Sequence, residues 1–179
     1  MRGNAGETPF GPEIWVRGPV SGGGDTALAE RQSEAEQQAT PQQFSWVNVH
    51  GGAGATTLAT LFGGADVGQR WPDPARGEPS TLLLVARTHA VGLRGVSQTL
   101  DLFRRGEQPA GLQIAAVVLV ADAPGRLPRE LQQRIKILGS AVAVHRVPWV
   151  AAWRTGAKLD GSIPRELLAL ARLVGHPVQ

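Results

Sequence analysis

The chain has 179 residues, which suffices for one domain with a hydrophobic core. It has no Cys, which excludes a disulfide framework and a thiolate metal site. Its formal net charge of +3 is small, and its basic residues are scattered along the sequence, whereas a dedicated nucleic-acid binder has a dense basic stripe. Because no apolar run reaches the roughly 20 residues that cross a bilayer, and the N-terminus has no apolar signal segment, we expect a cytoplasmic protein.

Residues 1–42 are predicted to be a disordered arm. They are rich in Gly, Pro, Gln and Glu, and such a composition buries too little apolar surface to fold. A short apolar segment around Trp15 interrupts the arm. We expect this segment to dock either on a protein partner or on the chain's own domain, which is predicted over residues 43–179.

From residue 44 onward, apolar runs alternate with helical patterns. Strands are predicted at 44–49, 82–86, 114–120 and 141–147, and helices after residue 54 and at 91–103, 128–138 and 164–174. Continuous apolar strands separated by helices indicate a parallel sheet that is buried on both faces. We therefore expect an α/β domain with three α/β/α layers and a mostly parallel sheet. The Gly- and Pro-rich segment 63–80 is predicted to be a surface loop.

A glycine-rich loop follows the first predicted strand. Glycines let backbone N–H groups approach a phosphate, and the N-terminus of the next helix adds a partial positive charge. The candidate nucleotide-binding residues are Gly51, Gly52, Ala53, Gly54, Ala55, Thr56 and Thr57. Thr56 is the candidate magnesium ligand if a magnesium nucleotide binds. The alternative is a strand-to-helix turn that holds no ligand.

The loop and four later segments resemble the ParA/MinD family of P-loop ATPases. The family's loop, Gly-Lys-Gly-Gly-x-Gly-Lys-Thr-Thr, matches residues 49–57 at its last three glycines and both threonines, and residues 82–94, 117–122, 144–149 and 153–156 resemble later family segments. The chain is also similar to uncharacterised actinobacterial MinD-like proteins whose loop has no lysine. The resemblance covers about residues 44–175. It implies a trimmed P-loop NTPase-like fold, with Asp122 and Pro148 beside the base of a bound nucleotide. The context of Asp122 itself favours a turn residue before Pro-Gly.

The departures from the family determine the expected function. Its two loop lysines are replaced by His50 and Ala55, and the 24 residues from Leu58 to Thr81 are too few for the two strands that carry the family's aspartates. Asp66 and Asp73 are either remnants of those aspartates or solvated loop acids. Because phosphoryl transfer depends on placed positive charge and an oriented water, we assign no catalytic residue and expect a pseudo-ATPase.

Two histidines follow predicted strands. His50 follows the first and His89 the second, and the carboxyl ends of parallel strands share one edge of the sheet, so we expect the two side chains to be neighbours. They are candidates for a metal site or for acid–base chemistry. Alternatively, His50 packs or hydrogen-bonds at the end of its strand.

Protein partners are expected at an aromatic and basic cluster. Trp149, Trp153 and Arg154 lie close together in the sequence, and tryptophan and arginine are favoured at interfaces. The alternative buries both indoles beneath the last helix. We thus expect an interaction or positioning module that binds a protein, with ATP or another nucleotide and magnesium as the candidate cofactors. The alternatives are a partner-activated ATPase that forms a nucleotide-switched homodimer, and a DNA-binding accessory protein. A membrane role is not expected.

Overall fold

The computed structural model describes residues 43–155 and 163–177. The chain divides after Thr40 into two units, and all the described residues belong to the second unit, Pro41–Gln179. The predicted arm and its Trp15 segment lie outside the described residues. In the part that is described, no helix has both the length and the apolar character to cross a membrane.

A five-stranded sheet forms the centre of the fold, and all of its strand pairs are parallel. Its order is β2-β1-β3-β4-β5, with β1 at Ser45–Asn48, β2 at Ala65–Asp66, β3 at Thr81–Arg87, β4 at Gln113–Val120 and β5 at Val144–Val147. The predicted parallel sheet is thus confirmed. From β1 the chain passes to β2 on one side and then to β3 on the other. The carboxyl ends of β1 and β3 are therefore the switch point at which open α/β sheets bind ligands.

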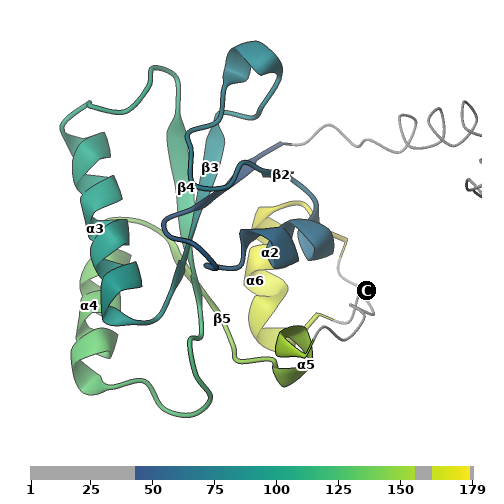
Figure 1. The fold of residues 1–179 in the computed structure, drawn as a ribbon, viewed down its shortest axis with the longest axis vertical. Coiled ribbons are helices and arrows are strands. Elements are labelled where there is room, and N and C mark those ends of the chain that lie inside the picture. Colours follow the sequence, from purple (N-terminus) through teal and green to yellow (C-terminus); the bar gives the residue numbers. More distant parts are fainter. Residues whose placement is uncertain (1–42, 156–162, 178–179) are drawn as a thin grey trace, which may run out of the picture. The chain divides into compact units, whose positions relative to one another are not determined.

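Helices cover both faces of this sheet (Figure 1). One face carries α3 (Ala90–Arg104) and α4 (Arg129–Gly139), and the other carries α2 (Ala55–Phe62), α5 (Ala151–Arg154) and α6 (Leu168–Leu173). The α/β class and the helical layers agree with the prediction.

Side chains of the central strands alternate between two hydrophobic clusters, as the two-residue period of a strand requires. Leu83 and Val85 of β3 join the cluster beneath α2 and α6, whereas Leu82, Leu84 and Ala86 join the cluster beneath α3 and α4. The predicted inward positions of α3 and α4 are confirmed, since all of them belong to or pack against the second cluster: Leu93, Val96, Leu100, Phe103, Leu131, Ile135 and Leu138.

The segment 63–80 is more structured than predicted. It contains β2 and the 3₁₀ helix η1 (Pro74–Arg76). The N–H of Ala65 donates to the carbonyl of Phe44 at 3.0 Å, and the N–H of Val67 donates to that of Trp46 at 3.2 Å. The prediction of a plain loop was wrong because a two-residue strand is too short to show any alternation in the sequence.

The C-terminal elements also differ from their predicted bounds. β5 begins at Val144 rather than 141, because the N–H groups of Ala141 and Val142 still bond the carbonyl of Leu138 at the end of α4. The last predicted helix begins as a 3₁₀ turn, η2 (Arg165–Leu167), before α6, and the short helix α5 was not predicted.

Candidate functional site

The glycine-rich loop joins the carboxyl end of β1 to the start of α2. Gly52 and Gly54 have φ angles of 69° and 117°, in a region that side chains with a Cβ rarely adopt. The side-chain oxygen of Asn48 accepts a hydrogen bond from the N–H of Ala55 at 3.2 Å, which fastens the helix start to β1. Within the described residues, the N–H groups of Gly52, Ala53 and Gly54 have no hydrogen-bond acceptor. The loop therefore has free donors, as an anion site requires.

The candidate loop residues fall into two sets. Ala53 and Ala55 are 0% and 1% exposed and belong to the core cluster under α2. Gly51, Gly52 and Thr56 are exposed. The side chain at position 55 is therefore a packed methyl group, and only the backbone and the threonines of this segment can contact a ligand.

His50 is engaged at both ring nitrogens. Its Nε2 accepts a hydrogen bond from the N–H of Arg87 at 2.9 Å, and its Nδ1 lies 2.9 Å from the carbonyl oxygen of Gly51. Because the backbone N–H can only donate, Nε2 is the acceptor and Nδ1 carries the proton in this arrangement. The prediction that His50 hydrogen-bonds at the end of its strand is confirmed.

His50 and His89 are neighbours, as predicted, with ring centroids 4.8 Å apart. His89 is the N-cap of α3, and its Nδ1 accepts a hydrogen bond from the N–H of Gly92 at 2.9 Å. Among the residues that the structure describes, no three His, Cys, Asp or Glu side chains group together to hold a metal ion. In this structure both histidines therefore organise backbone at the strand ends.

Arg87, at the end of β3, is a residue of the site that sequence analysis missed. Its Nε donates to the carbonyl of Gly52 at 2.9 Å, and its Nη1 reaches the carbonyl of Ala121 at 3.5 Å. The guanidinium therefore lies beside the glycine-rich loop. The available signal was one charged residue that closes an apolar strand at the carboxyl edge of the sheet.

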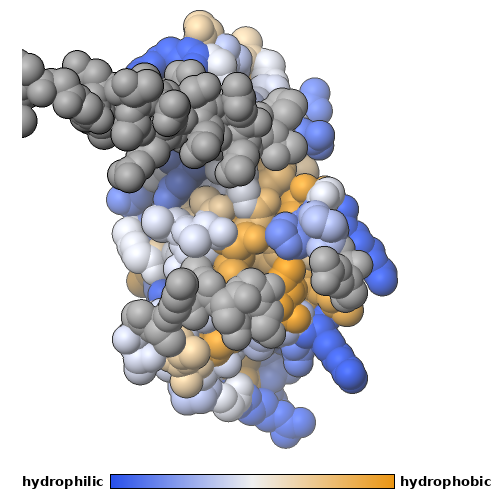
Figure 2. Space-filling view, turned by 90° about the vertical axis from the view of Figure 1, so that its right-hand side faces the viewer, coloured by the Kyte–Doolittle hydropathy of each residue, from blue (hydrophilic) through white to orange (hydrophobic). Residues whose placement is uncertain are grey.

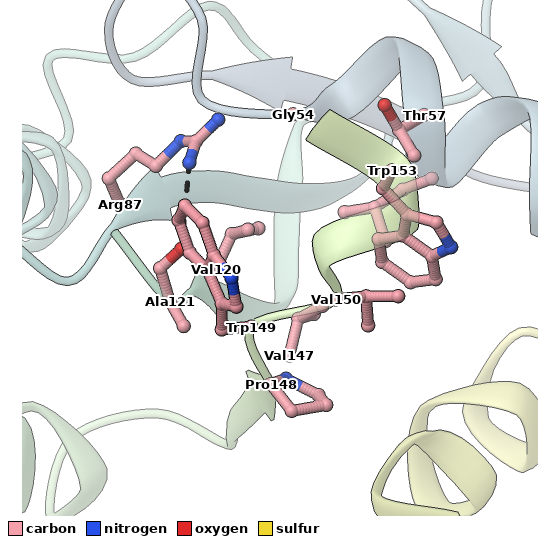
Figure 3. A pocket seen from close by; sticks show the side chains of 11 residues that line it. Gly54, Thr57, Arg87, Val120, Ala121, Val147, Pro148, Trp149, Val150 and Trp153 are labelled. Carbon is pink, nitrogen blue, oxygen red and sulfur yellow. Dashed lines mark hydrogen bonds between the residues drawn. The ribbon is translucent and has the colours of Figure 1, made fainter. Parts of the chain in front are cut away.

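A small pocket of about 80 Å³, open to solvent, lies at this edge between the start of α2 and the ends of β3, β4 and β5. Figure 3 shows Arg87 and Trp149 on one side of it, and Thr57 and Trp153 on the other. Pro148 lines the same pocket, together with Gly54 of the loop. The structure thus brings together predicted residues from the loop, from the end of β5 and from α5.

Asp122 does not belong to this pocket. Its side chain is exposed, and its N–H donates to Thr88 Oγ1 at 3.1 Å in the turn after β4. This arrangement fits a turn residue rather than a residue beside a nucleotide base.

Thr56 and Asp66 meet on the exposed side of the loop. Thr56 Oγ1 donates to Asp66 Oδ2 at 2.6 Å, and Asp66 Oδ1 accepts from the N–H of Gly68 at 3.1 Å. β2 lies next to β1, so its last residue faces the first turn of α2. Asp73 instead caps η1 by accepting from the N–H of Ala75 at 3.0 Å. Asp66 is therefore a bonded partner of the loop threonine and not merely a solvated acid.

The predicted aromatic partner residues are half-buried. Trp149 and Trp153 both line the pocket, and Trp153 also packs against the core cluster under α2 and α6. The side chain of Arg154 lies outside the described part of the chain. Figure 2 shows apolar residues gathered on the face that carries α2 and α6, where Leu173 is 45% exposed.

Searches against protein-family models, curated proteins and solved structures gave no match to this chain.

Proposed function

We propose that this chain is a ParA/MinD-like module with a P-loop type of fold, which binds a nucleoside phosphate without efficient hydrolysis and acts through a protein partner. One observation carries the proposal: the residues at the two positions where the family's loop has lysines, His50 and Ala55, stabilise the fold of this chain. Ala55 is packed in the core, and both ring nitrogens of His50 are engaged. A site that lacks two placed cations loses most of the charge stabilisation on which phosphoryl transfer depends.

Ligand binding is supported by the position and composition of the pocket. It lies at the carboxyl edge of the sheet, where ligands of open α/β folds bind. Gly54 and Thr57 of the loop line part of it, and Pro148 and the two tryptophans give it apolar walls. A phosphate at the loop and an aromatic base between the apolar walls would use both sets of residues.

Thr56 and Asp66 could hold a magnesium ion only together with the phosphates of a bound nucleotide. A hydroxyl and a carboxylate are oxygen ligands of the kind that Mg²⁺ prefers, and this ion is commonly held by one or two protein groups plus substrate phosphates. Bound magnesium would neutralise phosphate charge. Two exposed side chains alone make no cage, so we expect metal binding to require the nucleotide.

The same pair favours a second candidate, a partner-activated ATPase that dimerises with nucleotide. In that case another protein would supply the missing cations, as arginine fingers do. The mass of the chain in solution, measured with and without magnesium ATP, tests this candidate. A doubling of mass with ATP supports it, and an unchanged mass counts against it.

Action through a protein partner is supported by the apolar surface near the pocket. Trp149 and Trp153 are half-buried, and the face over α2 and α6 displays apolar side chains (Figure 2). Because the two tryptophans also line the pocket, a partner that contacts them could respond to whether a ligand is bound.

A titration of the full chain with a fluorescent ATP analogue, with and without magnesium, tests the proposal. We expect saturable binding that Gly54→Asp abolishes, because this change adds a negative charge and a Cβ at a φ of 117°. Gly139→Asp, at an exposed position of α4, is the matched control. It adds the same charge at a glycine that has no positive φ and where a Cβ would meet nothing within 4 Å. Absence of binding, or equal binding by Gly54→Asp, would contradict the proposal.

A further inference from the structure

We infer that Arg87 supplies, from β3, the positive charge that the loop itself lacks, and that it selects ligands carrying an anionic group. The inference rests on the proposed function, because it concerns the same pocket. It identifies the ligand as a nucleoside phosphate rather than a free nucleoside, and it assigns the phosphate to the guanidinium.

The charge of the pocket is one-sided. Among the described residues that line it, Arg87 alone has a charged side chain. Within the described part of the chain, Arg87 forms no ion pair with any carboxylate, whereas Arg70, Arg104 and Arg105 each have one. Arg87 is half-buried and has no carboxylate partner among the described residues, so an anionic ligand would supply the opposite charge.

The guanidinium is held in an orientation suited to an anion. Its Nε is anchored on the carbonyl of Gly52 at 2.9 Å, and the contact from Nη1 to Ala121 is long, at 3.5 Å. Its Nη2 makes no hydrogen bond with any described residue. An arginine anchored through Nε keeps its terminal N–H groups available in a fixed fork, which matches the oxygens of a phosphate.

The apolar walls of the pocket are suited to a ring. Trp149, on the side of Arg87, and Trp153, on the side of Thr57, present flat apolar surfaces, and Pro148, Val147 and Val150 also line the pocket (Figure 3). A free phosphate would contact only Arg87, and a nucleoside would contact only the apolar walls. A nucleoside phosphate uses both, so it should bind more tightly than either part.

The test compares three probes, namely ADP, tripolyphosphate and adenosine, on the full-length chain, with binding followed by calorimetry. Arg87→Gln is expected to lower the affinity for ADP and for tripolyphosphate about 10- to 100-fold, the range for losing a charge-assisted hydrogen bond. The affinity for adenosine is expected to stay unchanged. Arg87→Lys keeps the charge but loses the forked guanidinium, so its affinity for the two phosphate probes should lie between those of Arg87→Gln and the unmodified chain. Arg94→Gln is the matched control, since it removes the same charge from an exposed position on α3.

The outcomes separate this inference from the proposed function. A selective loss for the two phosphate probes supports both. If ADP binds and Arg87→Gln binds it equally well, the inference is overturned and the proposed function stands. Equal weakening of all three probes assigns Arg87 a purely structural role and also overturns the inference. If the unmodified chain binds none of the probes, the ligand-binding part of the proposed function fails, and the inference fails with it.

Discussion

His50 and Arg87 fasten each other's backbone across the carboxyl ends of β1 and β3. The imidazole of His50 accepts the N–H of Arg87 at 2.9 Å, while the side chain of Arg87 donates to the carbonyl of Gly52, two residues beyond His50. The loop is therefore held in place by protein groups alone. A loop with this support has its free N–H groups in position before any ligand arrives, which reduces the entropy that binding must overcome.

The first prediction concerns this reciprocal contact. His50→Phe keeps an aromatic ring beside His89 and removes both hydrogen bonds of the imidazole. It leaves the N–H of Arg87 without its acceptor, so we expect the free energy of unfolding to fall by about 1–3 kcal/mol, measured by urea denaturation. His89→Asn serves as the control, because asparagine is also a strong N-cap. Its free energy of unfolding should stay within about 0.5 kcal/mol of that of the original chain. Equal stability of His50→Phe and the original chain would show that the contact is not stabilising.

The close approach of α3 to the loop gives the second prediction. A Cβ at Gly92 would lie 2.3 Å from the carbonyl oxygen of Arg87 and 3.0 Å from Nε2 of His50. Because the first of these atoms is backbone, Gly92→Ala should destabilise the fold by about 1–3 kcal/mol, as overpacking does. Gly139→Ala, at the end of α4, meets nothing within 4 Å and should be neutral or stabilising by up to about 1 kcal/mol. Thermal unfolding of the two variants checks the difference, and similar melting temperatures would refute it.

The third prediction is a dependence of stability on pH. Hydrogen bonds from Arg70, and then from the backbone N–H of Asp73, lower the pKa of Glu78 from 4.5 to about 2. A carboxylate with a lowered folded pKa stabilises the fold above pH 4.5, and this contribution disappears as the pH falls towards 2. Between pH 4.5 and 2, the urea midpoint should therefore fall further in the original chain than in Glu78→Gln. The control is Glu130→Gln, at an exposed position of α4, and its urea midpoint should fall as much as that of the original chain. Parallel curves for all three would exclude a role for Glu78.

The fourth prediction concerns magnesium. If Thr56 and Asp66 hold the metal of a magnesium nucleotide, Thr56→Val and Asp66→Asn should remove the gain in nucleotide affinity that magnesium produces. Asp73→Asn is the control, because Asp73 caps η1 through a contact that asparagine can also make. Titrations with and without magnesium measure the gain. An undiminished gain in both loop variants would mean that the metal is held elsewhere.

Most of the fold could be predicted because long apolar runs carry a clear signal. β3 and β4 are almost entirely aliphatic, and their side chains alternate between two cores, a burial pattern that only a sheet covered on both faces provides. The two-residue β2 gave no such signal. Its place beside β1 depends on backbone hydrogen bonds from Ala65 and Val67, which no side-chain pattern reveals.

The site was predictable only in part, for a related reason. The glycine-rich loop and the neighbouring histidines follow from strand ends that meet at one edge of the sheet. The contact between Thr56 and Asp66 depends on the position of β2, so it could not be anticipated. Arg87 was missed because it ends an apolar strand, and its side chain turns towards the loop rather than into solvent.

The central claim is that the pocket holds a nucleoside phosphate and that the chain does not efficiently cleave ATP. The most direct measurement incubates the full chain with magnesium ATP, recovers the protein-bound nucleotide, and quantifies ATP, ADP and free phosphate. The account predicts bound ATP and no phosphate release above the protein-free background. Phosphate release well above background that Gly54→Asp abolishes would contradict it, as would the recovery of protein without nucleotide.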